Sequence, residues 1–199
     1  MSRASLLIVA IMAVCTPHAL SGQELPAAQI SAGYSYLASP SAIIDYGSDE
    51  RGDASHSGWF AEVVGNMFAH AAFVGQVSAT YTTSTVSGKA ERATHRAYSF
   101  LGGGRATSRC CGRVAPFGQV LAGMVRVNGD VRRGERLITH LGSDYFALLF
   151  GGGADIRLGA GPAGLHLAGD VVRINRGDDG FGPSGSTWRL LVGITAPMR

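Results

Sequence analysis

The chain has 199 residues, of which 46% are hydrophobic, and its 17 Lys and Arg residues against 14 Asp and Glu residues give a formal net charge of +3 at pH 7. The length suits one domain, and so small a charge balance gives no reason to expect a nucleic-acid partner. After the N-terminal segment, no apolar run approaches the ~20 residues of a membrane-spanning helix, so any crossing of a membrane must be by strands.

The first residues have the pattern of a secretory signal peptide. Arg3 supplies the positive charge, and the apolar run over 6–14 is too short to span a bilayer. Residues 19–21 then suit a signal peptidase. We therefore predict a cleaved signal peptide over 1–22 and one domain over 23–199.

Eight segments of alternating character follow, and they predict strands, because successive side chains of a strand point to opposite faces. We expect strands over 30–37, 58–66, 71–82, 95–104, 115–126, 145–157, 163–174 and 188–196. Long polar connections are expected at 39–57, 83–94, 127–143 and 175–186, with short ones at 67–70, 105–113 and 158–162. Short periplasmic turns that alternate with longer external loops are typical of a transmembrane β-barrel.

One face of each predicted strand is apolar, and the other is polar or small. In the fifth strand, Gln119 shares its face with Phe117 and Leu121, and we place that face inward. The predicted inward polar set is Glu62, Gln76, Gln119, Asp155, His166, Asp170 and Arg189. The predicted outward aromatic residues, which would form girdles at the membrane surfaces, are Tyr34, Tyr36, Trp59, Phe73, Tyr81, Tyr98 and Trp188.

Several glycine-aromatic pieces of these strands resemble the eight-stranded bacterial outer-membrane β-barrel family, which includes the small barrel domains of the OmpA and opacity-protein type. The pieces are Gly33-Tyr34-Ser35-Tyr36, Gly58-Trp59, 100–104, 116–123, 151–155 and 165–170. The resemblance covers essentially all of the chain after the signal peptide. It implies a small monomeric barrel without a conducting pore, because side chains fill the interior of eight strands. Such barrels usually end in an aromatic residue, whereas this sequence ends in Arg199.

We therefore predict an all-β fold, an eight-stranded antiparallel up-and-down transmembrane β-barrel in the outer membrane. The expected role is structural or one of surface interaction, with membrane lipid and lipopolysaccharide as neighbours and a surface ligand bound through the external loops. No catalytic, cofactor-binding or metal-ligating residue is predicted. Two alternatives stay open: a barrel enzyme that acts on lipid, and a soluble lipocalin-like barrel that binds a small apolar ligand.

The enzyme alternative depends on His166 and Asp170, which share a face at a spacing that permits a His–acid pair. We interpret both as members of a structural network with Glu62, Asp155 and Arg189, because ionisable groups inside a barrel are costly unless they are paired.

Other polar features have simpler interpretations. We expect His95 and His140 to be solvated near the external rim. The adjacent Cys110 and Cys111 cannot join distant segments, and we interpret them as small turn residues, with a vicinal disulfide left open. Arg-Gly-Asp tripeptides at 51–53 and 176–178 resemble an integrin-binding motif, but they arise readily in turn-rich loops. The predicted first loop is acidic, with Asp45, Asp49, Glu50 and Asp53. The predicted third loop is basic, with Arg126, Arg132, Arg133 and Arg136.

Overall fold

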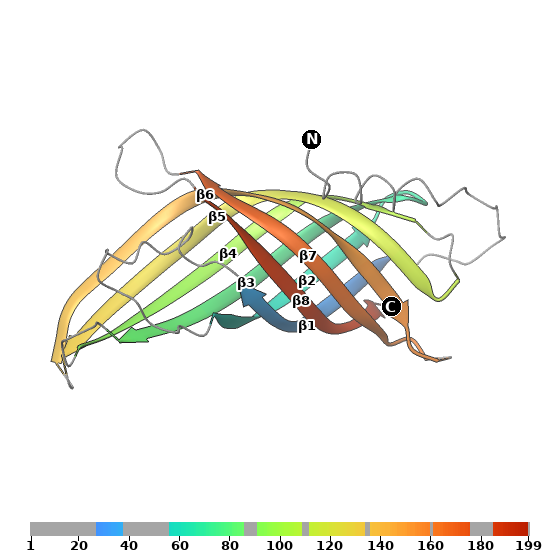
Figure 1. Ribbon diagram of the computed structural model, residues 1–199. Helices are drawn as coiled ribbons and strands as arrows, with labels where there is room; N and C mark the ends of the chain where they lie inside the picture. The colour runs from blue at the N-terminus through green and yellow to red at the C-terminus, as the bar shows by residue number, and fades with distance from the viewer. Residues whose placement is uncertain are drawn as a thin grey trace, which may run out of the picture.

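The protein forms one closed antiparallel β-barrel (Figure 1). The computed structural model describes residues 27–37, 56–85, 91–108, 112–133, 136–159, 161–175 and 185–198. Its strands are β1 (Ala28–Leu37), β2 (Ser57–Asn66), β3 (Ala71–Thr85), β4 (Glu91–Thr107), β5 (Val114–Arg133), β6 (Arg136–Arg157), β7 (Gly164–Asn175) and β8 (Gly185–Met198). Each strand pairs with its sequence neighbours, and β1 closes the barrel against β8. The predicted eight-stranded up-and-down barrel is therefore confirmed.

Several predictions fall outside the part of the chain that the structure describes. They concern the signal peptide, the cysteine pair at 110–111, the acidic first loop and both Arg-Gly-Asp tripeptides. In the described residues, no helix is both long enough and apolar enough to span a membrane.

Two of the expected long loops are wrong. The segment 127–143 is almost entirely strand, because β5 continues to Arg133 and β6 begins at Arg136. The segment 83–94 is shortened in the same way to 86–90. The polar residues of these two segments favour loops, but they keep the two-residue alternation of a strand. Polarity at these positions marks where the strands leave the apolar layer, while the ladder of backbone hydrogen bonds continues beyond it.

The barrel has two different ends. At one end, which we call the turn end, β1 begins, β8 ends, and the strands are joined by the short connections 67–70, 108–113 and 158–163. At the opposite end, which we call the loop end, β3 to β6 extend beyond their neighbours, and the β5–β6 pair is the longest (Figure 1).

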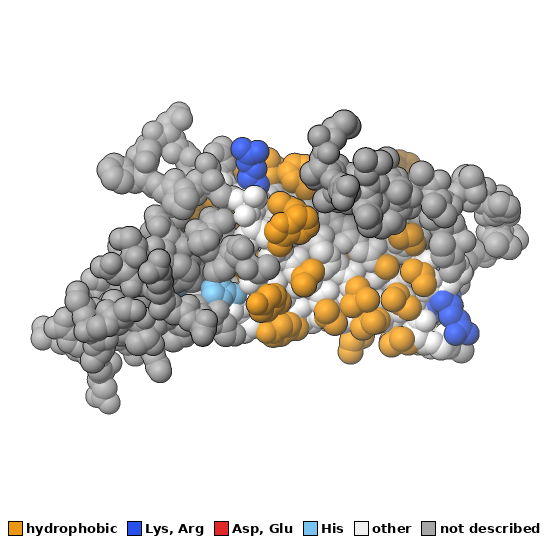
Figure 2. Space-filling view, in the orientation of Figure 1, with side chains coloured by type: hydrophobic (Ala, Val, Ile, Leu, Met, Phe, Trp, Pro, Cys, Tyr) orange, Lys and Arg blue, Asp and Glu red, His pale blue; other side chains and the backbone are white. Residues whose placement is uncertain are grey.

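The outside of the barrel is an apolar belt. On β8, Leu190, Val192 and Ile194 are 54%, 51% and 66% exposed. Figure 2 shows hydrophobic side chains gathered across the middle of the visible face, with Lys and Arg side chains toward its two ends. On β4, the belt runs over positions 98–106, which at ~3.3 Å per residue and a tilt of ~40° spans about 20 Å. That height is close to the ~25 Å apolar band of an outer-membrane barrel.

This belt separates a membrane barrel from the soluble lipocalin-like alternative. A soluble barrel would place its polar face outside, whereas here the outward-facing residues between the two ends are uncharged. At the loop end, the outward positions become polar within one or two residues of the belt, at Arg96, Arg126, Asp144, Arg173 and Ser186.

The inside of the barrel contains both apolar and polar layers. Gln119 is 4% exposed and Leu121 is fully buried, so the inward placement of that face of β5 is confirmed. The larger apolar cluster comprises Leu37, Val64, Ala72, Val74, Ala97, Leu101, Leu121, Val125, Ala147, Leu149, Val172 and Ile174. A smaller one comprises Phe60, Phe117, Ala168 and Leu191. Side chains from all eight strands therefore occupy the interior.

The seam between β1 and β8 depends on a glycine pair. Gly33 lies opposite Gly193, and a Cβ on Gly33 would lie 2.2 Å from the carbonyl oxygen of Val192. A Cβ on Gly193 would lie 2.4 Å from the carbonyl oxygen of Ala32. Both obstacles are backbone atoms of the facing strand, so a side chain at either position would push the two strands apart.

We expect Gly33→Ala to lower the free energy of unfolding by about 1–3 kcal/mol, because overpacking against backbone is poorly relieved. Gly75→Ala on β3 is the matched control, since a Cβ there meets nothing within 4 Å. Urea unfolding in lipid vesicles measures both. An equal loss of unfolding free energy in the two variants would show that the seam does not require glycine.

The apolar belt predicts a depth-dependent cost for charge. Val192→Arg, at the middle of the outward face of β8, should destabilise the inserted barrel by about 2–4 kcal/mol, and Met198→Arg at the turn end by at most about 1 kcal/mol. The difference in gel mobility between boiled and unboiled samples, followed along a urea series, reports the folded fraction. Equal effects at both depths would contradict the membrane belt.

Candidate functional site

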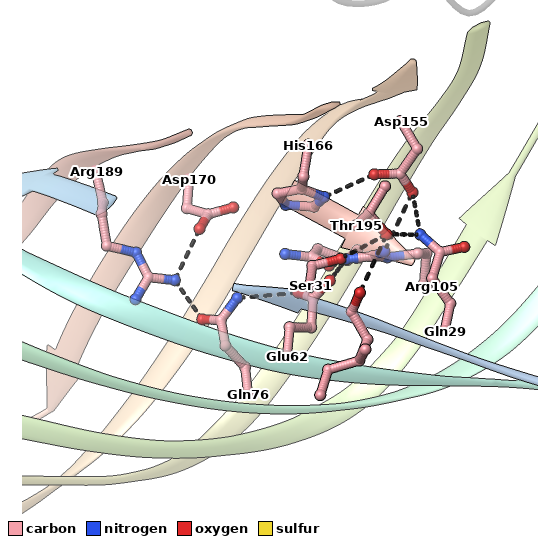
Figure 3. A network of polar contacts seen from close by, with 12 residues as sticks. Gln29, Ser31, Glu62, Gln76, Arg105, Asp155, His166, Asp170, Arg189 and Thr195 are labelled. Carbon is pink, nitrogen blue, oxygen red and sulfur yellow. Dashed lines mark hydrogen bonds and ion pairs between the residues drawn. The ribbon is translucent and has the colours of Figure 1, made fainter. Parts of the chain in front are cut away.

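A polar network runs through the barrel interior, and Figure 3 shows its members. Its first centre is the guanidinium of Arg105 on β4, which is 3% exposed. Arg105 forms an ion pair with Glu62 on β2, and its Nε donates a 3.1 Å hydrogen bond to Oε1 of Gln119 on β5. The same guanidinium lies 3.9 Å above the ring of Phe117. This cation is therefore held by a carboxylate, an amide oxygen and an aromatic face.

The second centre is Arg189 on β8. Its Nη2 donates to Oδ2 of Asp170 at 2.8 Å, and its Nη1 donates to Oγ of Ser78 at 3.0 Å. Gln76 joins the two centres, because its amide oxygen accepts from Arg189 while its amide nitrogen donates to Oε2 of Glu62 at 3.0 Å. The network therefore crosses the barrel interior from strand β8 to strand β4.

The third centre is Asp155 on β6. Its Oδ1 lies 2.7 Å from Nδ1 of His166, and its Oδ2 accepts a 3.0 Å hydrogen bond from Nε2 of Gln29. Gln29 also donates to Oγ1 of Thr195 at 2.6 Å, which in turn accepts from Ser31 at 3.0 Å. These contacts place hydrogen-bonded polar side chains across the β1–β8 seam.

His166 and Asp170 do not pair with each other, although their spacing on one face permits a His–acid pair. His166 pairs with Asp155, and Asp170 pairs with Arg189. The reason is register: Asp155 lies directly opposite His166 on the neighbouring strand, and Asp170 lies directly opposite Arg189. Directly opposed side chains are closer than two residues four positions apart on one strand, so the cross-strand partners prevail.

Sequence reasoning placed Glu62, Gln76, Gln119, Asp155, His166, Asp170 and Arg189 inside, and all seven side chains are there. It missed Arg105 and Gln29, because the expected strands stopped at 104 and began at 30. The missing signal was the alternation itself: Arg105 continues the inward face of Leu101 by two steps of two residues. An arginine favours the end of a membrane strand, but here three hydrogen bonds to two partners, Glu62 and Gln119, satisfy it inside the barrel.

The geometry of His166 suits a structural role. Its side chain is fully buried, and it lies between the rings of Phe60 and Phe117, at centroid distances of 5.5 Å and 5.4 Å. Its Nε2 has no hydrogen-bond partner in the described chain. A general base needs a proton to abstract within hydrogen-bond reach, whereas this imidazole packs against two aromatic rings. Nor do the described residues contain a group of three His, Cys, Asp or Glu side chains that would hold a metal ion.

A second polar feature lies outside the membrane layer, on the part of the β3–β6 sheet that extends past the belt. Strand register places Arg92 on β4 opposite Arg132 on β5, and Arg133 on β5 opposite Arg136 on β6. We call these four residues the arginine tip. They come from three strands and occupy neighbouring rungs of the ladder. The predicted basic third loop is therefore a pair of strands.

The histidines near the loop end also belong to strands or their edges. His95 lies on β4, and His140 on β6 is opposite Asp130. His56 directly precedes β2, where its carbonyl accepts a 3.0 Å hydrogen bond from the backbone nitrogen of Leu37. Burial lowers the pKa of the His56 imidazole, because desolvation disfavours its charged form.

A closed eight-stranded antiparallel barrel with an apolar outside and a polar interior defines the class as the eight-stranded outer-membrane β-barrel. No protein-family model matches the sequence, and no curated protein matches it. Solved structures do match the fold. The attachment invasion locus protein Ail of Yersinia pestis is 13% identical, with a TM-score of 0.55 over 85% of this chain and 96% of that chain.

Two further structures show the same fold. Ail of Yersinia pestis in complex with the heparin analogue sucrose octasulfate is 14% identical, with a TM-score of 0.54 over 85% of this chain and 96% of that chain. Neisserial surface protein A (NspA) is 11% identical, with a TM-score of 0.59 over 86% of this chain and 96% of that chain. At such identities the likeness is one of fold. It confirms the eight-stranded outer-membrane barrel, while the narrower OmpA and opacity-protein label stays a prediction.

The network predicts a large cost for removing one partner of its central ion pair. Arg105→Met should lower the free energy of unfolding by about 3–5 kcal/mol, because it leaves the carboxylate of Glu62 buried without its cation. Adding Glu62→Gln should restore part of that loss, since the unpaired charge is then gone. Urea unfolding of the two single variants and of the double variant in lipid vesicles tests this. A double variant that loses the sum of the two single losses would refute the pairing.

Proposed function

We propose that this chain is a monomeric outer-membrane protein that acts by interaction at the cell surface, without an open pore and without catalysis. The loop end would face outward, because short turns lie on the periplasmic side of such barrels. The filled interior supports the absence of a pore, since apolar clusters and ion pairs occupy the lumen. The buried, aromatic-enclosed His166 supports the absence of acid–base chemistry.

The ligand class we propose is an anionic glycan, bound at the arginine tip. The observation that carries it is the register, which pairs Arg92 with Arg132 and Arg133 with Arg136 on successive rungs, one pair on each face of the sheet, where it projects from the belt. Guanidinium groups pair with sulfate and phosphate through parallel hydrogen bonds. One protein of similar fold, Ail, has been solved with a heparin analogue, which supports this class by analogy of fold.

Sulfated polysaccharides of a host surface and phosphorylated sugars of the bacterial surface share this anionic chemistry. Two ligands separate the sources. One is a heparin fragment, and the other is the phosphorylated core oligosaccharide of lipopolysaccharide without its lipid. Each would be titrated into the purified barrel in nanodiscs. Preference for heparin supports adhesion to another cell, and preference for the core oligosaccharide supports a role within the bacterial surface.

Replacing all four arginines of the tip with serine should weaken heparin binding about tenfold to thirtyfold, since exposed ion pairs contribute up to ~1 kcal/mol each. The remaining affinity should also depend less on salt. Arg113→Ser with Arg157→Ser is the matched control, because both residues lie exposed at the turn end. Titration calorimetry at two salt concentrations measures both effects. Unchanged affinity in the tip variant would refute the proposed glycan site.

A further inference from the structure

A pair of outward-facing arginines lies at the upper edge of the apolar belt, below the arginine tip. Arg126 on β5 is directly opposite Tyr98 on β4, and Arg96 is directly opposite Asn128. Arg96 and Arg126 are therefore diagonal neighbours on the same outer face, with Cβ atoms ~7 Å apart. Two guanidinium groups at that spacing can reach one tetrahedral anion between them.

The height of this pair relative to the membrane is fixed by the residues below it. Phe100 and Met124, the next outward residues toward the turn end, are 58% and 52% exposed and belong to the belt. Tyr98 and Tyr81 lie at the level where aromatic girdles contact lipid headgroups. The guanidinium groups therefore stand one step above the acyl chains, at the depth of the headgroup phosphates.

Both arginines of the pair are exposed, so their guanidinium groups can contact an anion. The side chain of Arg126 is 61% exposed, and its Nε lies 3.2 Å from Oδ1 of Asp144 on β6. This ion pair engages the Nε of a guanidinium that also carries two Nη donor groups. Arg96 is also exposed, and its register neighbours Tyr81 and Asn128 carry no charge. Among the described residues, the two cations thus stand with two carboxylates, Asp144 beside Arg126 and Asp130 diagonal to Arg96 across Asn128.

We propose that Arg96 and Arg126 bind a phosphate group of a phosphorylated glycolipid in the outer leaflet, with Asp144 as a positioning residue for Arg126. The tyrosines at the same level pack beside the headgroup, and Phe100 and Met124 contact its acyl chains. This lateral site is separate from the arginine tip. It rests on the proposed function only in placing the loop end outside.

A single outward arginine at the same end of the belt provides a control. Arg173 on β7 is exposed and lies opposite Leu148 and Ser186, and the neighbouring register positions that the structure describes hold no arginine. It offers one guanidinium where the pair offers two. Arg173→Gln should therefore remove one positive charge at the same end of the belt without removing a two-armed phosphate site.

The test uses the full barrel in detergent micelles and measures lipid retention by native mass spectrometry. The probes are bisphosphorylated lipid A, the same lipid with its phosphates removed, and phosphatidylglycerol. We expect bisphosphorylated lipid A to be retained about tenfold better than the dephosphorylated form. Arg96→Gln with Arg126→Gln should abolish that preference, and Arg173→Gln should leave it.

Several results would overturn the proposal. They are equal retention of the two lipid A forms, an unchanged preference in the double variant, and equal retention of phosphatidylglycerol, which would remove the assignment to a glycolipid. Gel mobility before and after boiling verifies that each variant is folded. Failure of heparin binding at the arginine tip would leave these results untouched, because the tip is intact in every variant used here.

Discussion

Closure of the backbone hydrogen-bond ladder is the constraint on which this structure depends. Inside an apolar layer, an unpaired backbone N–H or C=O group costs several kcal/mol, so a sheet there cannot have a free edge. The pairing of β1 with β8 from Ala28↔Met198 to Leu37↔Arg189 removes both edges at once. The facing glycines at 33 and 193 serve this closure, because they let the two backbones approach where side chains would collide.

Closure creates an interior that is occupied by side chains, many of them polar. The three centres at Arg105, Arg189 and Asp155 join residues from strands that are far apart in sequence. Each charge there has a partner of opposite sign or a hydrogen-bonding amide, which offsets the free-energy cost of burying a charge at low dielectric. The outside has no such centre within the belt. Polar chemistry is therefore confined to the lumen, the belt edges and the sheet beyond them, and the last two offer it to other molecules.

The sequence predicted the number of strands, the faces of their residues and seven inward polar side chains, because a period of two is a local property of neighbouring residues. It failed where the same local pattern has two meanings. Polar residues over 127–143 mark either a loop or a strand that has left the membrane, and only pairing between β5 and β6 distinguishes the two. Arg105 was lost for a related reason, since an arginine inside a barrel is acceptable only beside partners that lie on other strands.

What the sequence determined by itself is therefore the alternation: apolar side chains on one face, polar side chains on the other, and the places where each face changes character. What only the tertiary structure decided is which residues of different strands contact one another. Register set His166 against Asp155 and Asp170 against Arg189, and it gathered arginines from β4, β5 and β6 at the tip. The physical reason is that facing is fixed by the chirality and pleat of each strand alone, whereas register depends on closing all eight strands into one ring.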